Sequence, residues 1–469
     1  MSGLFSSLNS TVSALSAHSL AIETTGKNLA NINNAAYARE RVVYHSGATV
    51  VTPTGAQSMG LTADVEQTRD TLLDRQVLRE TALGSYYSTM QSAYQRAQAG
   101  LGETLTSTTA TNSSSSSTSA TGISASLDDF FNSFQNFAAR PTDSGARQAL
   151  LSSASIMVDR LKQADATLSQ LQSDLNTQVG DDVTNANGLL ATIAKLNKQI
   201  GSVEINSPGS AVDLRDQRQE ALEKLSKLMP VTAVEDASGQ VQVSSADTSG
   251  SPVALVTLAT VNGVVAFNGT QITAGSPATT LALSSGSIQG AIDARDGAIQ
   301  TLRGQLDSLT NQLVTSVNGI YNVGGTGSNF FTPAGTTAGT VSLASGLTAT
   351  SLIANSGATA GGNDIALAIA NLATKKFSTA GGNQIDGSFS TFFSSSVAQF
   401  GQAAATTSSS VSNQETIERL VRTQRDSVSG VNLDEETANL IKYQRAFQAS
   451  SRMVQTIDTL LDTVIRLGQ

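Results

Sequence analysis

Two histidines and one charge-dense segment are the residues whose chemistry could support catalysis or metal binding. His18 and His45 are the only histidines in 469 residues, and nothing near either one has the spacing of a metal site or a catalytic triad. We therefore interpret both as surface or packing residues. The segment DLRDQRQEALEKL, residues 213–225, pairs opposite charges at helical spacing. This is more typical of a solvated helix face than of an active site.

Other motifs also fail to indicate a reaction. GGNDIA at 361–366 and GGNQID at 381–386 faintly resemble calcium-binding repeats, but such repeats occur in tandem every nine residues or so, and we interpret both segments as turns. There is no nucleophile elbow, phosphate-binding loop or dinucleotide fingerprint. The sequence therefore predicts no catalytic, metal-binding or cofactor-binding residue.

Composition limits the possible partners. The formal net charge is -9 and no cluster of lysines and arginines occurs, which disfavours nucleic-acid binding. The absence of cysteine excludes disulfides and thiolate metal sites. No apolar run is long enough for a membrane span, and Lys27 is the first positive residue, so we expect neither membrane insertion nor a cleaved secretory signal.

The beginning of the chain predicts one long helix with a narrow apolar stripe. Between Leu4 and Ile32, apolar residues recur every seven positions: Leu8, Leu15, Ile22 and Leu29. The companion row is Thr11, His18 and Thr25, where a stable coiled coil would carry leucine. We therefore expect this helix to need a partner.

The end of the chain predicts a second, more apolar helix. Asn432 can cap its start, with Glu435 reaching back, and Asp434 to Glu436 favour the positive end of the helix dipole. Its apolar residues form a heptad row and a second row: Leu433, Leu440, Phe447, Val454 and Leu461, then Tyr443, Ile457 and Val464. A third row contains Ala446, Ala449, Ser450, Met453, Leu460 and Leu467. One antiparallel neighbour would not cover so wide a surface, so we expect several neighbours.

The interior alternates between helical periodicity and polar segments. We expect an extended segment over 37–51 and a helix over 64–99, then a flexible loop at 104–126, where 16 of 23 residues are Ser or Thr. Ser126 begins the next predicted helix, whose aromatic face is a candidate core: Leu127, Phe130, Phe131, Phe134 and Phe137. Further helices are predicted over 144–200, 213–228, 299–320 and 389–428, with loops and small strands over 323–385.

These patterns predict a mainly α protein with a β-rich insertion. Strand periodicity and Ser-Gly or Asn-Gly turns fill much of 202–285. We expect three domains: a terminal helical coiled-coil pair from 1–34 and 433–469, a domain of long helical rods from 35–201 and 286–432, and an outer β domain from 202–285. The terminal pair could be an intramolecular coiled coil that completes the fold, or it could serve assembly between chains. Its surplus apolar faces favour assembly.

Both ends of the chain resemble a known family. The segments SSLNSTVSALSAHSLAIETTGKNLANINNAAYARERVVY and SGVNLDEETANLIKYQRAFQASSRMVQTIDTLLDTVIRL are similar to the terminal signatures of bacterial flagellar rod, hook and hook-associated proteins. The segments FFNSFQNFAARPTDSGARQALL and DLRDQRQEALEKLSKL resemble the hook-associated members at the hook-filament junction rather than the hook or rod subunits. Family members usually carry Thr-Pro-Gly where this chain has Asn34, Ala35 and Ala36, so the resemblance predicts the first helix but not the turn that follows it.

The resemblance implies a structural role without catalysis. It implies that the terminal helices form an inner coiled-coil layer around a central channel, and that a ring of copies joins the hook protein to a second junction protein. It also implies secretion to the flagellum by type III export, with a cytoplasmic chaperone on the C-terminal helix. A hook or distal rod subunit is the alternative within the family. A secreted adhesin or a peptidoglycan-acting enzyme using the β-rich block is the alternative outside it.

Overall fold

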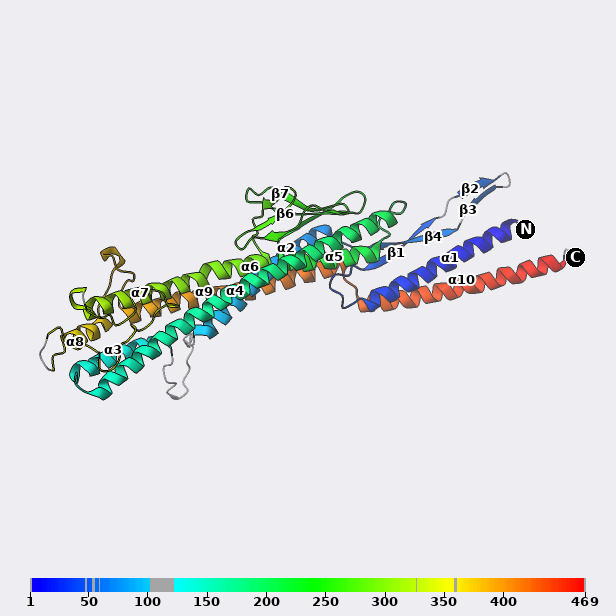
Figure 1. Ribbon diagram of the computed structural model, residues 1–469. Helices are drawn as coiled ribbons and strands as arrows, with labels where there is room; N and C mark the ends of the chain where they lie inside the picture. The colour runs from blue at the N-terminus through cyan, green and yellow to red at the C-terminus, as the bar shows by residue number, and fades with distance from the viewer. Residues whose placement is uncertain are drawn as a thin grey trace. The chain divides into compact units, whose positions relative to one another are not determined.

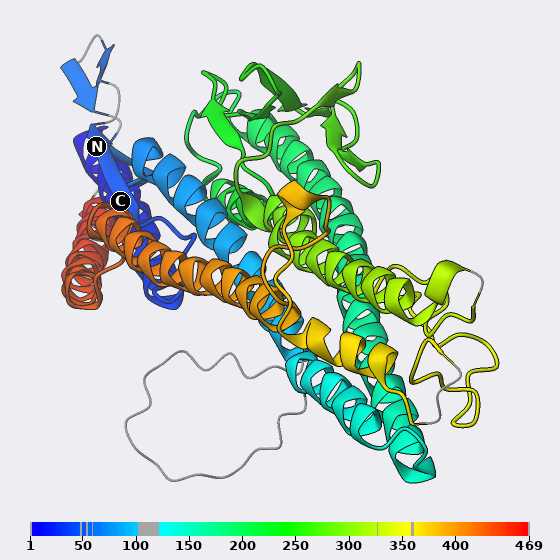
Figure 2. The same ribbon diagram turned by 90° about the vertical axis from the view of Figure 1, so that its left-hand side faces the viewer.

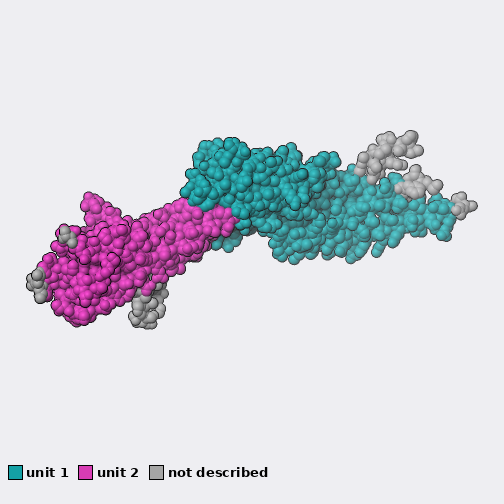
Figure 3. Space-filling model, viewed as in Figure 1, with its two compact units in different colours: residues 1–85, 182–286, 413–469 teal, residues 86–181, 287–412 magenta. Residues whose placement is uncertain are grey.

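The computed structural model describes residues 2–46, 49–52, 55–58, 60–101, 122–325, 327–357 and 361–467. They form two compact units, shown in different colours in Figure 3. Unit 1 consists of residues 1–85, 182–286 and 413–469, and unit 2 consists of residues 86–181 and 287–412. Each unit is therefore built from segments that are far apart in the sequence.

Unit 1 begins with the N-terminal helix α1 (Ser2–Ala30) and a β-ribbon (Figure 1). Strand β1 (Glu40–Ser46) pairs antiparallel with β4 (Leu61–Gln67), so that Glu40 lies opposite Gln67 and Ser46 opposite Leu61. Strands β2 (Thr49–Thr52) and β3 (Gly55–Ser58) pair in the same way between them. The C-terminal helix α10 (Leu433–Leu467) also belongs to this unit.

The β-rich segment of unit 1 follows helix α5 (Val212–Leu228). Its four-stranded sheet has the order β5-β6-β7-β8, from β5 (Thr232–Glu235), β6 (Val241–Ala246), β7 (Pro252–Thr257) and β8 (Thr260–Val261). A second sheet has the order β11-β10-β9, from β9 (Ala266–Phe267), β10 (Ile272–Ala274) and β11 (Thr279–Thr280). All these neighbours are antiparallel, as short turns between consecutive strands require.

Asn197 fastens the four-stranded sheet to the long helix α4 (Ser144–Val203). This side chain is fully buried, and its amide donates to the carbonyls of Val241 and Leu258, at 2.7 Å in both cases. Its oxygen accepts from the Val241 N–H and the Arg218 guanidinium, both at 3.1 Å. A single residue therefore satisfies polar groups of the helix α5 and of the sheet.

Aromatic side chains form part of the core of unit 2, whose helices are drawn in Figure 2. Its elements include α3 (Ile123–Ala139), α6 (Gly286–Ala294), the π-helical turn Arg295–Ile299, α7 (Gln300–Tyr321) and α8 (Asp364–Ala370). The phenyl rings of Phe130, Phe134 and Phe330 lie within 6 Å of one another, and all three are fully buried. Helices α2 (Thr71–Leu101), α4 and α9 (Phe389–Ser429) have residues in both units.

The structure confirms a mainly helical protein with small antiparallel sheets, and most predicted helices. The predicted helix over 64–99 is wrong at its start, because 61–67 forms β4 and Asp70 caps a helix that begins at Thr71. Ser126 lies inside α3, which begins at Ile123, so it is not the helix start and 123–126 is not loop. Helix α8 was not predicted. The rest of the predicted loop over 104–121 lies outside the described residues, and the three-domain division stays a prediction.

We expect Asn197→Ala to destabilise unit 1 by roughly 3 kcal/mol, because it removes four hydrogen bonds of a fully buried amide to Val241, Leu258 and Arg218. Chemical unfolding followed by circular dichroism measures this change. Asn185→Ala is the matched control, because Asn185 is exposed on the same helix. Equal stability of the two variants would show that Asn197 is not an anchor.

Candidate functional site

The two ends of the chain form an antiparallel helix pair. Figures 1 and 2 show α1 and α10 side by side, with both chain ends at the same end of the pair. The strands β1 and β4 lie against α1 as well. Gly60, with φ at 94°, approaches α1 so closely that a Cβ there would lie 3.0 Å from the Ser13 Cβ. Helix α1 is therefore packed between α10 and the ribbon.

The buried stripe of α1 differs from the predicted one. The residues below 5% exposure are small or polar and recur at helical spacing: Ala17, Ala21, Thr24, Thr25 and Asn28. The predicted residues Leu8, Leu15, Ile22 and Leu29 are only half-buried. The spacing of Ala17, Ala21 and Thr24 is visible in the sequence, but leucine periodicity is the stronger signal and hides it. Apolar surface on α1 is therefore left partly open.

Helix α10 buries one face and exposes its neighbouring rows. Of the predicted residues, Ile457 and Leu461 are buried, and four are half-buried: Leu440, Tyr443, Phe447 and Val454. Leu433 and Val464 are exposed, at 54% and 38%. On one side of the packed face lies a row that we name the outer flank: Met453, Leu460 and Val464, with 57%, 49% and 38% exposure. Each of these residues keeps more than a third of its surface exposed.

The start of α10 is capped and also tied to β1. The Asn432 side-chain oxygen accepts the N–H groups of Asp434 and Glu435 at 2.9 and 3.3 Å, which confirms the predicted cap. The Glu435 carboxylate lies 2.7 Å from the guanidinium of Arg39, the residue just before β1. Arg39 also pairs with Glu436 at 2.7 Å. The helix therefore leaves the body of unit 1 at a fixed point.

Asn28 is the centre of the contacts at this point. Its amide donates to the Glu40 carbonyl and the Glu436 carboxylate, at 2.9 and 3.0 Å. Its oxygen accepts from the Tyr37 hydroxyl and the Glu40 N–H, at 2.8 and 3.0 Å. Asn28 and Glu436 are 1% and 2% exposed. These contacts, which we name the joint, connect α1, β1 and α10.

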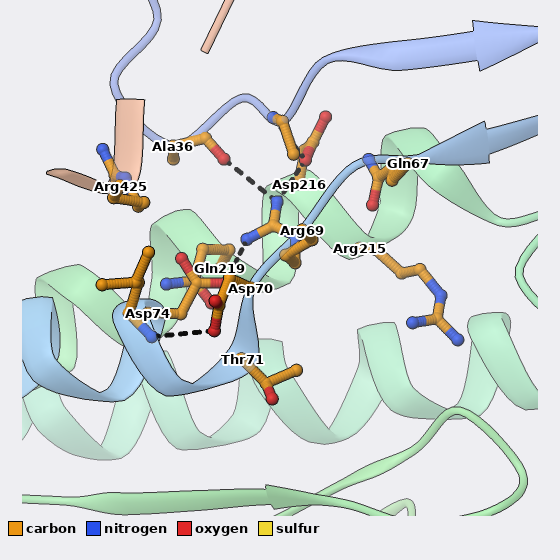
Figure 4. Close-up of polar contacts among 12 residues, drawn as sticks. Ala36, Gln67, Arg69, Asp70, Thr71, Asp74, Arg215, Asp216, Gln219 and Arg425 are labelled. Carbon is orange, nitrogen blue, oxygen red and sulfur yellow. Dashed lines mark hydrogen bonds and ion pairs between the residues drawn. The ribbon is translucent and has the colours of Figure 1, made fainter. Parts of the chain in front are cut away.

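The turn after α1 is made by asparagine and held by arginines. The Asn34 side-chain oxygen accepts the Ala36 N–H at 3.2 Å, and its carbonyl accepts the Tyr37 N–H at 3.1 Å. This side chain forms the turn where the family pattern has Pro-Gly. Figure 4 shows Arg69 between the Ala36 carbonyl, Asp74 and Asp216, while Arg425 donates to the Ala35 carbonyl. The turn is thus fixed by side chains from α5 and α9 and by the segment before α2.

Two carboxyl groups, Glu40 at the joint and Asp216 beside the turn after α1, are buried without full compensation. Burial raises the pKa of Glu40 to about 7, against the weaker opposing effect of Lys27. Burial also raises the pKa of Asp216 to about 6, although Arg69 opposes this. One carboxylate oxygen on each of Glu40 and Asp216 is buried and has no hydrogen-bond partner among the described residues. Ionisation of these groups therefore works against the folded joint.

The two histidines lie in packing and surface positions, as the sequence predicts. The His18 ring packs edge-on against Tyr44, with ring centroids 6.1 Å apart. The His45 imidazole is exposed and lies 3.6 Å from the Asp64 carboxylate. In the described ranges, no group of three or more histidines or carboxylates is arranged to hold a metal ion. No described helix combines the length and hydrophobicity needed to cross a membrane.

The stability of the joint should fall as pH rises. A folded-state pKa near 7 for Glu40 means that the folded chain holds a proton that the unfolded chain loses above its ordinary value of 4.5. Between pH 5 and 8 we therefore expect the wild type to lose about 2 kcal/mol of unfolding free energy relative to Glu40→Gln. Urea unfolding at both values measures this, with the exposed Glu66→Gln as control. A difference between wild type and Glu40→Gln that does not change with pH would contradict it.

The chain matches two family models. Residues 109–331 match the flagellar hook-associated protein FlgK helical domain, and residues 422–467 match the flagellar basal body rod FlgEFG protein C-terminal region. The second match covers all of α10 and the end of α9. The two matches therefore include both the interior helices and the C-terminal partner of α1.

Similar proteins carry one common name. Flagellar hook-associated protein 1 of Bacillus subtilis is 27% identical over 99% of this chain and 98% of its own length. The proteins of that name from Salmonella typhimurium and Escherichia coli are 25% and 24% identical over 48% of this chain, and 38% and 39% of theirs. A solved structure of the flagellar hook junction protein FlgK from Burkholderia pseudomallei aligns with 55% of this chain and 46% of that chain, at 26% identity and a TM-score of 0.46. These matches confirm the resemblance to the flagellar hook-associated proteins, and to flagellar hook-associated protein 1 among them, that the sequence predicts.

Proposed function

We propose that this protein is a structural subunit of the bacterial flagellum that joins hook to filament, and that its terminal helices carry assembly. The observation that carries the proposal is the outer flank, three apolar side chains that lie exposed along a helix whose packed face is already occupied. A helix with more apolar surface than its own chain covers is typical of an interface with other chains.

The terminal pair offers further apolar surface beside the outer flank. Leu433, Ile441 and Ile465 are 54%, 60% and 57% exposed on α10, and Val12 is 44% exposed on α1. The half-buried leucines of α1 add to this surface. Because these residues lie on several sides of the pair, one neighbouring helix would not cover them all. Packing among several copies, as in a ring, would bury them.

The joint supports this role by fixing where the pair leaves the body of the chain. Interfaces between identical subunits require each copy to present the same surface in the same orientation. The hydrogen bonds of Asn28 and the ion pairs of Arg39 supply that constraint at the base of the pair. The joint would therefore transmit load between the terminal helices and the rest of unit 1.

Relatives named flagellar hook-associated protein 1 favour the junction over other positions in the flagellum. We propose copies of this chain, the hook protein and a second junction protein as partners, and the flagellum as the site of action after type III export. A cytoplasmic chaperone would cover α10 before export, since the outer flank is exposed on that helix. The segments 1–34 and 433–469 would form the inner layer, and 202–285 the outer β domain. No reaction is part of this proposal.

Leu460→Gln tests the assembly surface. In a strain whose only copy carries this change, we expect several-fold fewer hooks with filaments, because a polar amide would be buried in each subunit contact at a cost of about 1–3 kcal/mol. Electron microscopy counts the filament-bearing hooks. Thr459→Gln, at the adjacent exposed position, is the matched control and should assemble normally. Normal filament attachment with Leu460→Gln would contradict the role of the outer flank.

Immunogold labelling separates the junction from the other axial positions. We expect label only at the boundary between hook and filament, because the family match includes the FlgK helical domain over 109–331. Antibody against flagellin and against the hook protein marks the two sides of the boundary as internal controls. Label along the whole hook or in the rod would instead support a hook or distal rod subunit.

A further inference from the structure

A cavity of about 190 Å³ lies in unit 1, between the first turn of α2, helix α5 and the strands β5 and β6. Four arginines line it: Arg69, Arg75, Arg215 and Arg218. Apolar side chains also line the cavity, among them Leu78, Leu222 and Val241. The lining also includes the carboxylates of Asp74 and Glu235, so four guanidinium groups and two carboxylates lie beside aliphatic side chains.

Two of these arginines share one carboxylate. Arg215 pairs with Glu204 and Glu235, both at 2.7 Å, while Arg218 pairs with the same Glu235 at 3.1 Å. The Arg218 side chain is only 4% exposed, and burial lowers its pKa to about 10. A buried guanidinium normally requires full ionic compensation. Here Glu204 and Glu235 balance the charges of Arg215 and Arg218, and Arg218 also donates to the Asn197 oxygen and the Gly239 carbonyl.

The other two arginines hold unused donors. Arg69 is bonded through its terminal nitrogens to Asp74, Asp216 and the Ala36 carbonyl, but its Nε is buried without a partner in the described part of the chain. The Arg75 guanidinium donates through Nε to the Thr71 carbonyl at 3.3 Å. Among described residues, no carboxylate lies within ion-pair distance of Arg75. Arg75 is exposed, so it lies where a ligand could enter.

We propose that this cavity binds a carboxylate carried on a short aliphatic chain. Guanidinium groups bind carboxylates through paired, charge-assisted hydrogen bonds, and Arg75 has its terminal nitrogens available for them. The leucines and the valine would cover the aliphatic part. At roughly 30 Å³ for each water-sized group, the volume fits about six non-hydrogen atoms. Inorganic phosphate would leave the apolar side chains uncovered, so it is the weaker fit.

The carboxylate could come from two sources with the same chemistry. One is a free small acid, and the other is a glutamate side chain of a neighbouring chain in an assembly. The proposal of a free acid does not depend on the proposed function. The proposal of a glutamate from a neighbouring chain rests on it, because it requires an assembly of chains. Loss of the site should reduce filament attachment only if the carboxylate comes from a neighbouring chain.

Titration of the full-length chain with butyrate, capped glutamate and phosphate tests the site. We expect saturable binding of butyrate and capped glutamate by calorimetry, and weaker binding of phosphate. Arg75→Gln should weaken carboxylate binding at least about tenfold, as expected for loss of a charge-assisted contact. Arg79→Gln, one turn further along α2 and exposed, is outside the cavity and should bind as the wild type does.

Absence of saturable carboxylate binding would overturn the proposal, and so would equal weakening by Arg75→Gln and Arg79→Gln or phosphate binding as tight as butyrate. If Arg75→Gln loses binding but its hooks still carry filaments, the ligand is a free acid. If filament attachment also falls, the acid belongs to a neighbouring chain. Because Leu460 lies outside the cavity, failure of the Leu460→Gln experiment would not affect this result.

Discussion

The hydrogen bonds of Asn28 are the constraint on which the arrangement of the chain ends depends. A buried asparagine has two donors and an acceptor oxygen that must all find partners, and here the partners come from Tyr37, Glu40 and Glu436. Packing of small residues alone would leave the rotation of α1 poorly defined. Because the amide fits only one arrangement of α1, β1 and α10, it fixes the register of the terminal pair.

Fixing the pair in this way determines which apolar residues are left over. Ala17 and Ala21 face the packed side of α1, since they share a stripe with Asn28, and the larger leucines move toward the edge. On α10, burial of Ile457 and Leu461 leaves Met453 and Leu460 exposed beside them. Buried carboxyl groups at Glu40 and Asp216 make the same region sensitive to pH. The packing around the joint therefore sets the register of the terminal pair, the apolar surface that it leaves exposed and the pH dependence of the region.

Much of the fold could be predicted from the sequence because long helices have strong periodicity. The helices over 144–203, 212–228 and 433–467 and the aromatic core of α3 follow from apolar spacing and capping residues. The joint could not be predicted, because Asn28 and Glu436 are 408 positions apart and polar residues carry no periodic signal. The start of α2 was misplaced because 61–67 fits either period, and pairing with β1 decides it. The assembly residues were found as candidates, but which of them remain exposed depends on the packing of α1.

The antiparallel pairing of the first and last helices also has a consequence for the order in which the molecule can form. Asn28 and its partner Glu436 are 408 positions apart, so the contact closes a loop that includes most of the chain. Local helices and the aromatic core can form before this loop closes, because their contacts span shorter distances along the chain. Until residue 436 is present, one amide donor of Asn28 lacks its partner Glu436 and α1 lacks its helical partner α10. The joint can therefore form only in a chain that includes α10, so the final packing of the first helix depends on the last one.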